Sequence, residues 1–348
     1  MSWLVTGGAG FIGSALCHYL VESTDRPVTV IDKLTYAANP KSLKQLEETG
    51  RLELIVADIA DSSAMVDIVQ RTAPRAIFHL AAETHVDRSI DGPAAFVSTN
   101  LAGTCSMLEA ARGHFDRLAM SDKEVFRFIH VSTDEVFGSL GKAGAFDETT
   151  AYAPSSPYSA SKAGSDHLAR SWHHTFGLPV IVSNCSNNYG PRQFPEKLIP
   201  LMILKCLAEE PLPVYGDGGN VRDWLHVDDH ARALAILAES GKTGETYCIG
   251  GGSERTNLEL VEEICRIMDV RHVSGAPHQQ RIKFVADRPG HDFRYAIDSS
   301  KLTRELGWRP KHDFETGLTQ TIDWYLANQD WWLPAQQSVY AGERLGTA

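Results

Sequence analysis

The chain has 348 residues, 43% of them hydrophobic, and a formal net charge of −11. This length exceeds that of a usual single domain and predicts about two domains. The acidic balance excludes a nucleic-acid-binding or anionic membrane surface, although a basic pocket for a phosphate can still lie inside an acidic shell. There is no apolar run of membrane-spanning length and no room for a signal peptide before the first predicted strand, so we expect a soluble, cytoplasmic protein.

Short apolar runs rich in β-branched residues alternate with helix-like apolar spacing through the first half of the chain. This alternation predicts a Rossmann-type α/β fold with a doubly wound parallel sheet, in which the loops gather at the carboxyl ends of the strands. The expected strands are 3–6, 28–31, 52–56, 76–80, 126–131 and 180–183. The expected helices are 11–21, 62–71, 94–112 and 158–176.

The alternation weakens after about Asn187, where connections rich in proline, glycine and aromatic residues begin. We therefore expect a larger Rossmann-type domain over residues 1–186, which carries the ligand-binding loops of the sheet, and a smaller α/β substrate-binding domain over 187–226 and 251–348. A helix near 227–238 and a buried strand at 246–249 are expected to return to the first domain, so the segment near 227–250 belongs to it. None of the six cysteines forms a C-x-x-C pair, which indicates reduced packing residues, and we expect no metal site.

A glycine-rich run, TGGAGFIG at residues 6–13, lies between the first expected strand and the first expected helix. Glycines there permit a tight turn and a close approach of the backbone to a pyrophosphate. Asp32, at the end of the second strand, can accept hydrogen bonds from a ribose hydroxyl and disfavours a 2′-phosphate, so the pattern favours NAD over NADP even though Lys33 follows it. The alternative is a structural turn with a surface aspartate.

Tyr158 and Lys162 stand four residues apart in the run YSASK and therefore share one face of the expected helix. An ammonium group near a phenol can lower the pKa of the phenol and can also bind ribose hydroxyls, so that the phenolate acts as a base toward a sugar hydroxyl. The same spacing also occurs in ordinary surface helices. Beside a dinucleotide loop it indicates hydride transfer at a carbinol.

These motifs resemble the extended short-chain dehydrogenase/reductase family and, within it, the nucleotide-sugar 4,6-dehydratases. The resemblance runs from Thr6 to Tyr295 and includes DKLTYA at 32–37, HLAAETHVDRSI at 79–90 and NNYGP at 187–191. It implies NAD as cofactor and a homodimer, for which the helices at 94–112 and 158–176 are the candidate interface. The residues that it implies for NAD are Gly7, Gly10, Phe11, Ile12, Gly13, Asp32, Lys33, Leu34, Thr35, Asp58, Ile59, Leu80, Ala81, Ala82, Thr84, Thr99, Tyr158, Lys162 and Asn187.

The run HVSTDEVFG at 130–138 places Thr133, Asp134 and Glu135 at the carboxyl end of the fifth strand. A helix cap or a solvated turn is the ordinary explanation of such a triplet. Related sugar epimerases usually lack the acidic pair. By resemblance, Tyr158 deprotonates the C4 hydroxyl as hydride passes to NAD, Glu135 removes the C5 proton, and Asp134, as a neutral acid, protonates the departing C6 hydroxyl before hydride returns to C6.

In this interpretation Thr133 orients the C4 hydroxyl, and Tyr158 reprotonates C5 or the oxyanion at the end of the cycle. Two adjacent carboxyls suit the chemistry because burial and mutual repulsion keep one of them protonated near neutral pH. The catalytic candidates are Thr133, Asp134, Glu135, Tyr158 and Lys162.

The resemblance further implies dTDP-glucose as the substrate. Its candidate binding residues are Thr84, Thr133, Asn187, Glu196, Lys197, Leu198, Pro213, Tyr215, Arg222, Asn257, Arg288, His291 and Tyr295. Arg222 and Arg288 can grip a diphosphate with two hydrogen bonds each, but each has a neighbouring aspartate and could instead close the domains through a salt bridge. Tyr215 could equally be a core residue.

Three other functions remain open at this level: a 4,6-dehydratase for a UDP-, CDP- or GDP-linked sugar, a nucleotide-sugar 4-epimerase, and a redox-sensing regulator that binds NAD without turnover. The acidic pair argues against the epimerase, and the intact Tyr158 and Lys162 argue against the regulator. Trp331 and Trp332 near the C-terminus are interpreted as packing residues of a final helix.

Overall fold

The computed structural model describes residues 1–287 and 290–338. Seven parallel strands form its main sheet, in the order β10-β6-β5-β4-β1-β2-β3. Strand order reverses between β1 and β4, the point where doubly wound sheets bind ligands. The predicted Rossmann-type sheet is therefore confirmed. Its strands are β1 (Trp3–Thr6), β2 (Val28–Asp32), β3 (Leu52–Val56), β4 (Ala76–His79), β5 (Arg127–Thr133), β6 (Val180–Cys185) and β10 (Thr246–Ile249).

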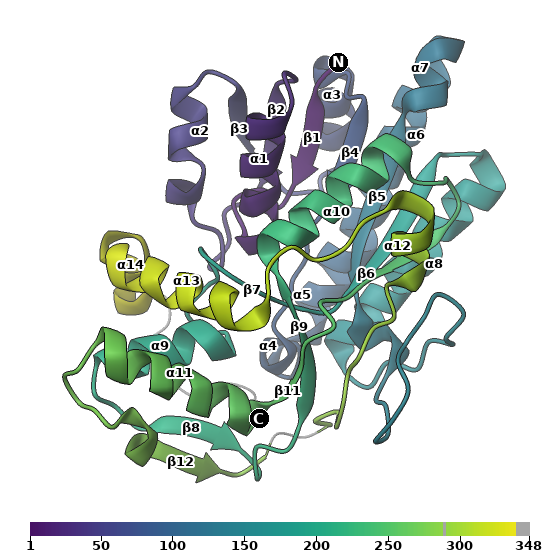
Figure 1. The fold of residues 1–348 in the computed structure, drawn as a ribbon. Helices are drawn as coiled ribbons and strands as arrows, with labels where there is room; N and C mark the ends of the chain where they lie inside the picture. The colour runs from purple at the N-terminus through teal and green to yellow at the C-terminus, as the bar shows by residue number, and fades with distance from the viewer. Residues whose placement is uncertain (288–289, 339–348) are drawn as a thin grey trace.

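Helices cover both faces of this sheet (Figure 1). The inner strands are buried on both sides, as β2 is along its whole length, which explains why they appear in the sequence as apolar runs. The edge strand β3 is partly exposed. One apolar layer draws on α1 (Phe11–Ser23), α2 (Lys44–Glu48), α10 (Val227–Ser240) and α12 (Ser300–Leu306). The opposite layer draws on α3 (Ser62–Thr72), α6 (Thr104–Arg117) and α8 (Pro157–Phe176).

The prediction of one continuous helix over residues 94–112 is wrong in one respect. The structure has α5 (Pro93–Phe96), a wide π-helical segment η2 (Val97–Gly103) and then α6. Within η2, the Asn100 side chain accepts from the backbone N–H of Glu83 at 2.9 Å and donates to its carbonyl at 3.1 Å. Such π segments redirect side chains and often accompany functional sites. Here the segment ties the loop after β4 to the helical layer.

A smaller unit lies at the carboxyl edge of the main sheet (Figure 1). Its strands are β7 (Asn187–Tyr189), β9 (Val221–His226) and β11 (Glu254–Thr256) in one sheet, and β8 (Leu212–Tyr215) and β12 (Ile282–Val285) in another. Its own apolar core includes residues of α9 (Leu198–Leu207), α11 (Asn257–Arg271), α13 (Phe314–Ala327) and α14 (Gln329–Ser338). The remaining short elements are α4 (Val86–Asp91), α7 (Met120–Val125), η1 (Pro40–Ser42), η3 (Asp134–Phe137) and η4 (His278–Arg281).

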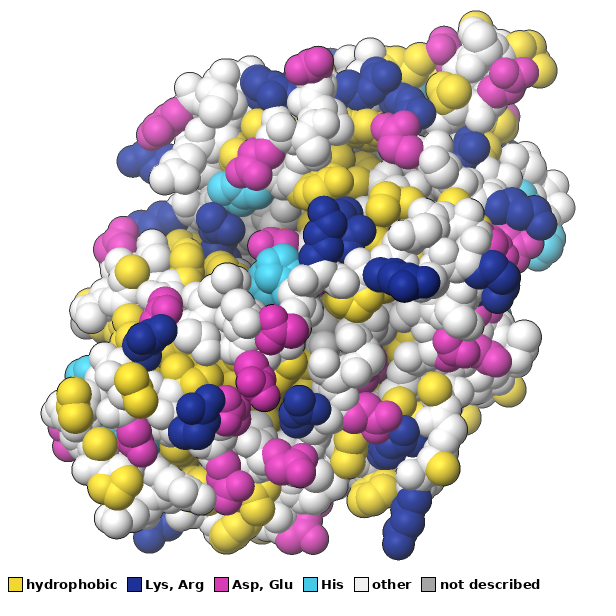
Figure 2. All heavy atoms as spheres, viewed as in Figure 1, with side chains coloured by type: hydrophobic (Ala, Val, Ile, Leu, Met, Phe, Trp, Pro, Cys, Tyr) yellow, Lys and Arg dark blue, Asp and Glu magenta, His cyan; other side chains and the backbone are white. Residues whose placement is uncertain are grey.

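The chain crosses between the two units several times. Strand β10 pairs with β6, α10 packs on α1, and α12 packs beside β10. We therefore propose a larger domain of residues 1–186 with 227–250, and a smaller one of 187–226 and 251–348. Within the smaller one, segment 300–308 packs against the larger domain, because Leu302 and Trp308 belong to its apolar core. No helix in the described part of the chain is long and apolar enough to cross a membrane. Figure 2 shows acidic and basic side chains interspersed on the face in view.

Candidate active site

Two adjoining cavities lie where the smaller unit meets the carboxyl edge of the main sheet. The first is bounded by the glycine loop, the ends of β4 and β5, and α8. The second is bounded by the loop before α9, by β8 and β9, and by the start of α11. Glu135, Asn187 and Glu196 belong to the walls of both. A ligand can therefore extend continuously from one cavity into the other.

The glycine loop is shaped for a close approach of backbone to ligand. Gly7 has a φ of +71°, and a Cβ at this position would lie 2.8 Å from the backbone of Ala81. A Cβ at Gly13 would lie 2.2 Å from the Gly7 carbonyl oxygen, so helix α1 can pack on the loop only with glycine there. Helix α1 begins at Gly10 without a side-chain cap, which leaves the N–H groups of its first turn for an anion such as a pyrophosphate. These features fit a dinucleotide.

The charges around Asp32 fit NAD. Its carboxylate accepts from the N–H of Ala9 at 3.0 Å and of Leu34 at 2.8 Å, which orients it and leaves lone pairs for ribose hydroxyls. The Lys33 ammonium lies 3.5 Å from Glu83 and 3.8 Å from Asp58. Because these carboxylates already neutralise Lys33, the cationic group that a 2′-phosphate would need is engaged elsewhere.

The structure brings most of the predicted cofactor residues together at the first cavity and at a small recess beside it. Two lie outside these walls. Leu34 packs against the core, and Asp58 caps its own turn by accepting from the Ala60 N–H at 2.9 Å. Those in the first cavity are Gly7, Gly10, Phe11, Ile12, Gly13, Thr35, Leu80, Ala81, Ala82, Thr84, Tyr158, Lys162 and Asn187. Those in the recess include Asp32, Lys33, Ile59 and Thr99.

Helix α8 presents Tyr158 and Lys162 to the first cavity, as their spacing predicts. The helix starts with a capping box between Ser156 and Ser159, so its first turn is held firmly. The Lys162 ammonium donates to the carbonyl of Val131 at 2.8 Å. Burial, and then the nearby Glu135 carboxylate, raise the pKa of Tyr158 well above its ordinary value. This direction is opposite to the lowering expected from the sequence, because burial outweighs the ammonium group one turn away.

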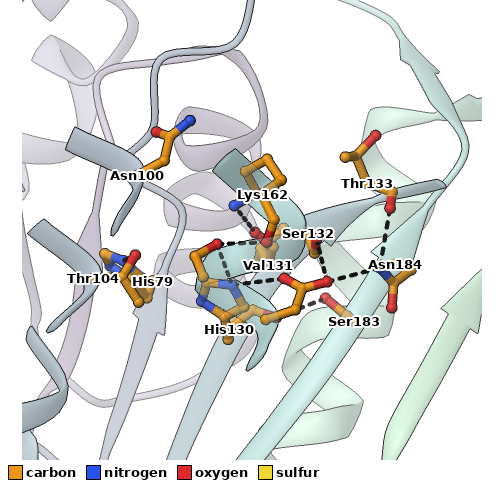
Figure 3. A network of polar contacts seen from close by, with 12 residues as sticks. His79, Asn100, Thr104, His130, Val131, Ser132, Thr133, Lys162, Ser183 and Asn184 are labelled. Atoms are coloured by element: carbon orange, nitrogen blue, oxygen red, sulfur yellow. Dashed lines mark hydrogen bonds and ion pairs between the residues drawn. The ribbon is translucent and has the colours of Figure 1, made fainter. Parts of the chain in front are cut away.

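A buried network that the sequence analysis did not assign lies directly behind Lys162 (Figure 3). Asp166, one further turn along α8, accepts from Ser132 at 2.8 Å and from the Tyr152 hydroxyl at 2.7 Å. Its other oxygen lies 3.0 Å from Nε2 of His130. Hydrogen bonds from His130 and Tyr152, together with the Lys162 charge, hold the pKa of Asp166 below its usual value despite complete burial.

This network holds the face of α8 that carries Tyr158 and Lys162 against β5. The only local signal for it in the sequence is an aspartate four residues after Lys162, which continues the same helical face. His130 and Ser132 belong to β5, and Asn184, whose amide donates to Asp166 at 3.3 Å, belongs to β6. These partners are far apart along the chain, so the spacing alone does not identify them.

The acidic pair begins at the end of β5. Thr133 does cap the short helix η3, since its hydroxyl accepts from the Glu135 N–H at 3.3 Å, and the ordinary explanation of the triplet is therefore part of the structure. The cap does not account for Asp134. This carboxyl is only 2% exposed, and its Oδ2 has no hydrogen-bond partner among the described residues. Burial, followed by the charges of Glu135 and Asp223, raises its pKa well above the ordinary value.

The second cavity gathers nearly all of the predicted substrate residues. Thr133 lies instead in the wall of the first cavity, beside the acidic pair. Arg288 lies outside the described residues. Those in the second cavity are Thr84, Asn187, Glu196, Lys197, Leu198, Pro213, Tyr215, Arg222, Asn257, His291 and Tyr295.

Arg222 and its neighbour Asp223 have separate surroundings. The guanidinium of Arg222 stacks over the ring of Tyr295, 4.3 Å from its centroid, and donates to the carbonyl of Asp292 at 3.0 Å. Asp223 accepts instead from backbone N–H groups, including that of Ser253 at 2.7 Å. The aromatic stacking and the carbonyl contact set the plane of the guanidinium in the cavity wall.

Glu196 makes contacts that the sequence analysis did not anticipate. Its carboxylate lies 3.1 Å from the Arg88 guanidinium and accepts from the Tyr36 hydroxyl at 2.9 Å. Arg88 also stacks over the Tyr36 ring, 3.9 Å from its centroid. This cluster joins the loop after β2 to the smaller unit. Glu196 is therefore held at the junction of the two cavities.

One group of potential metal ligands, His226, Asp228 and His312, lies outside these cavities. The two imidazole rings are stacked, with centroids 3.9 Å apart. Nδ1 of His226 accepts from the Asp228 N–H at 3.3 Å, and Nδ1 of His312 lies 2.9 Å from Asp229. His226 thereby caps the start of α10.

Comparisons with known proteins agree with this geometry. The family model described as GDP-mannose 4,6 dehydratase matches residues 4–321. A probable dTDP-glucose 4,6-dehydratase of Sinorhizobium fredii is 54% identical over 346 residues, 99% of each chain. A dTDP-glucose 4,6-dehydratase of Escherichia coli is 53% identical and covers 95% of this chain and 94% of its own.

Solved structures of similar fold include dehydratases and epimerases that act on nucleotide sugars. The crystal structure of DesIV, a dTDP-glucose 4,6-dehydratase of Streptomyces venezuelae with NAD and TYD bound, has a TM-score of 0.88 and 44% identity and covers 96% of this chain and all of its own. A UDP-glucose 4-epimerase of Thermotoga maritima with UDP-glucose has a TM-score of 0.84 at 29% identity, covering 94% of this chain and all of its own. The chain belongs to the dTDP-glucose 4,6-dehydratase family, within the extended short-chain dehydrogenases/reductases.

Proposed function

We propose that the protein converts dTDP-glucose to dTDP-4-keto-6-deoxyglucose and water, with one bound NAD reduced and reoxidised in each turnover. The observation that carries this proposal is the position of Asp134 and Glu135. Both side chains belong to the wall of the same cleft as Tyr158, and burial raises the pKa of Asp134 well above its ordinary value, which favours the protonated acid. A hydride-transfer site alone does not require such a pair, whereas the loss of water requires an acid and a base.

The first step is oxidation at C4, for which the bound NAD supplies the hydride acceptor. Tyr158 takes the proton of the C4 hydroxyl, and Thr133 beside it orients that hydroxyl. The Lys162 ammonium has two N–H donors beyond the one directed at Val131, and these can bind ribose hydroxyls. A cationic nicotinamide ring close to Tyr158 favours the phenolate and opposes the rise in pKa that burial causes.

The second step is elimination across C5 and C6. The C4 ketone acidifies the C5 proton, and the carboxylate of Glu135 accepts it. Asp134 donates its proton to the C6 oxygen, which leaves as water, so the charge on the acidic pair is conserved as one carboxyl gains the proton that the other loses. Hydride then returns to C6, and the proton held by Tyr158 passes to C5, which completes the product. Transfer of the proton on Glu135 back to Asp134 restores both carboxyls for the next turnover.

The direct test is incubation of the holoenzyme with dTDP-, UDP-, CDP- and GDP-hexoses, followed by mass detection of water loss. We expect dTDP-glucose to react fastest. Faster water loss from a hexose linked to another nucleotide would show that this nucleotide sugar is the substrate. A product of unchanged mass with inverted configuration at C4 would identify an epimerase. No product from any of these sugars, with NAD still bound, would support the regulator.

Two variants separate the steps. Glu135→Gln should still oxidise C4 but stop before water loss, so that the absorbance of enzyme-bound NADH rises without a lag. Tyr158→Phe should abolish even that signal, whereas Tyr152→Phe, which removes a buried hydroxyl outside the cleft, should retain it. Near-normal turnover by Tyr158→Phe would contradict its role as the base.

We further infer a homodimer in the cytoplasm. Val97, at the start of η2, is 55% exposed and Phe176, at the end of α8, is 44% exposed, so apolar groups lie at the surface along the candidate helices. The unpaired cysteines suit a reducing compartment. Sedimentation of the wild-type protein and of a Val97→Glu variant tests the interface, and a monomeric wild type would overturn it.

A further inference from the structure

The segment between β2 and α2, residues 33–42, forms part of the cover of the first cavity; we call it the cofactor loop. Thr35 and Ala37 belong to the cavity wall, together with the glycine loop and α8. The N–H of Asn39 donates to the carbonyl of Ala9 at 2.9 Å, so the loop lies against the glycine turn itself. A dinucleotide in this cavity lies next to the cofactor loop.

The C-terminal helix α14 holds one end of the cofactor loop. The indole Nε1–H of Trp331 donates to the hydroxyl of Ser42 at 3.0 Å, in a fully buried hydrogen bond. The Asn39 amide donates to the carbonyl of Trp331 at 3.1 Å, and the Lys41 ammonium donates to the carbonyl of Asp330 at 2.6 Å. Figure 1 shows α14, in yellow, below α2 and above α9. These contacts join residues about 290 positions apart in the chain.

Trp331 is itself held in place by the core of the smaller unit. Its side chain is 7% exposed, and its ring meets that of Trp324 edge to face, with centroids 5.2 Å apart. The Trp331 indole is therefore a rigid donor that reaches from the smaller unit to the loop of the larger one. Packing alone does not require that an indole N–H be paired with a hydroxyl of another domain.

The middle of the cofactor loop is held by a second contact, the Tyr36–Glu196–Arg88 cluster described above. The smaller unit thus grips the loop on both sides of Ala37. Opening the loop requires that both contacts break. Of the two, the one at Trp331 involves no residue of either cavity wall.

We propose that Trp331 is a positioning residue that clasps the cofactor loop over bound NAD through Ser42 and so retains the cofactor between the two hydride transfers. This inference rests on the proposed function, in which hydride removed from C4 must return to C6 of the same sugar. If NADH dissociated after the first step, the cycle would stop with an oxidised sugar in the site. A slow cofactor release is therefore part of the activity.

The test measures NAD dissociation from purified holoenzyme in the absence of any sugar. Trp331→Phe keeps an aromatic ring at this position and removes the N–H donor together with part of the indole, a loss of volume that the control variant below shares. We expect NAD to dissociate about fivefold faster, the change that one net hydrogen bond of ~1 kcal/mol produces. Ser42→Ala should give a similar increase, and the double variant should add little to either single variant, because both changes break the same bond.

The matched control is Trp332→Phe in the same helix. Trp332 is equally buried, at 6% exposure, but its indole donates within the smaller unit, to the carbonyl of Tyr325 at 2.9 Å. Its loss should leave the NAD dissociation rate unchanged. A dissociation rate for Trp331→Phe equal to that of the wild type, or an equal rise with Trp332→Phe, would overturn the clasp.

A second readout uses turnover. With dTDP-glucose, Trp331→Phe should release free NADH into solution about fivefold more often per turnover than the wild type, while the rate of C4 oxidation in the first turnover stays unchanged. The sugar-free dissociation rate tests the clasp alone, and the mass of the product tests the proposed function alone. Failure of one is therefore distinguishable from failure of the other.

Discussion

Asp134 and Asp166 are two buried carboxyls beside the same strand, β5, and their surroundings differ sharply. Asp166 is fully buried, but hydrogen bonds from His130 and Tyr152 and the Lys162 charge outweigh desolvation and lower its pKa. Asp134 is equally inaccessible, keeps an oxygen without a partner among the described residues, and has a raised pKa.

The difference distinguishes a structural carboxylate, Asp166, from a proton donor, Asp134. A buried carboxylate that is fully hydrogen-bonded contributes to stability and stays ionised. One that is buried without enough partners costs stability and holds its proton, and such a cost is retained where the proton is used. The hydrogen bonds that Asp166 accepts from β5 and from Tyr152 fix the face of α8 that carries Tyr158 and Lys162. At η3, the buried Oδ2 of Asp134 has no such partner among the described residues, which leaves an acid ready to donate.

The largest effect is expected from Asp134→Asn. The amide cannot donate the proton that the C6 hydroxyl needs, so turnover of dTDP-glucose should fall about 10²- to 10⁴-fold. A C6-fluoro analogue, whose leaving group needs less help, should lose less than the natural substrate. Stability should not fall, because an amide that is always neutral replaces a carboxyl whose charged form is disfavoured by burial. Equal losses for the two substrates, measured by steady-state kinetics, would contradict the acid role.

The next effect is expected from Asp166→Asn, which should lower the free energy of unfolding by ~3 kcal/mol because it removes one partner of a buried charged network. Denaturant unfolding measures this change. The exposed Asp67, on α3, provides a matched control in Asp67→Asn, which should leave stability unchanged. Unaltered stability in Asp166→Asn would contradict the distinction between the two carboxyls.

The pH dependence of stability should have opposite signs at the two sites. Asp166 has a folded-state pKa below 3.8, so its stabilisation is present above that pH and is lost as pH falls through the lowered value. Asp134 has a folded-state pKa above 3.8, so its presence costs stability increasingly as pH rises from 3.8 through the raised value. In thermal unfolding, Asp166→Asn should be less stable than the wild type at neutral pH, and this difference in stability should shrink in acid. The stability of Asp134→Asn relative to the wild type should instead increase as pH rises. A difference of the same sign in both variants would refute this.

The smallest effect is expected from Tyr152→Phe. It removes the hydrogen bond to Asp166 and the one accepted from Arg170, and it leaves the bonds to Asp166 from Ser132, His130 and Asn184. The free energy of unfolding should therefore fall by about 1.5 kcal/mol, with turnover close to that of the wild type. Chemical denaturation and steady-state kinetics on one preparation check both halves. A loss as large as that of Asp166→Asn would show that Tyr152, rather than the whole set of donors, holds the carboxylate.

Local sequence determined the elements that carry the chemistry. β1, β3 and β10 begin and end at the predicted residues because each is a short, largely apolar run between turn signals. The glycine loop, the i, i+4 spacing of Tyr158 and Lys162, and the acidic pair after β5 depend on neighbouring residues, so the sequence alone predicts where each is. The break at Val97–Gly103 was not predictable in this way, because Asn100 departs from regular helix to reach the backbone of Glu83.

Only the tertiary structure decided what those elements can do. Asp223 and Arg222, which act on the pKa of Asp134, approach it from β9, and the donors to Asp166 come from β5, β6 and the segment before α8. Burial overturned the expected lowering of the Tyr158 pKa. Trp331 and Ser42 meet across 289 residues. Charge, desolvation and hydrogen bonding depend on distance in space, which the order of residues does not state and which the fold alone sets.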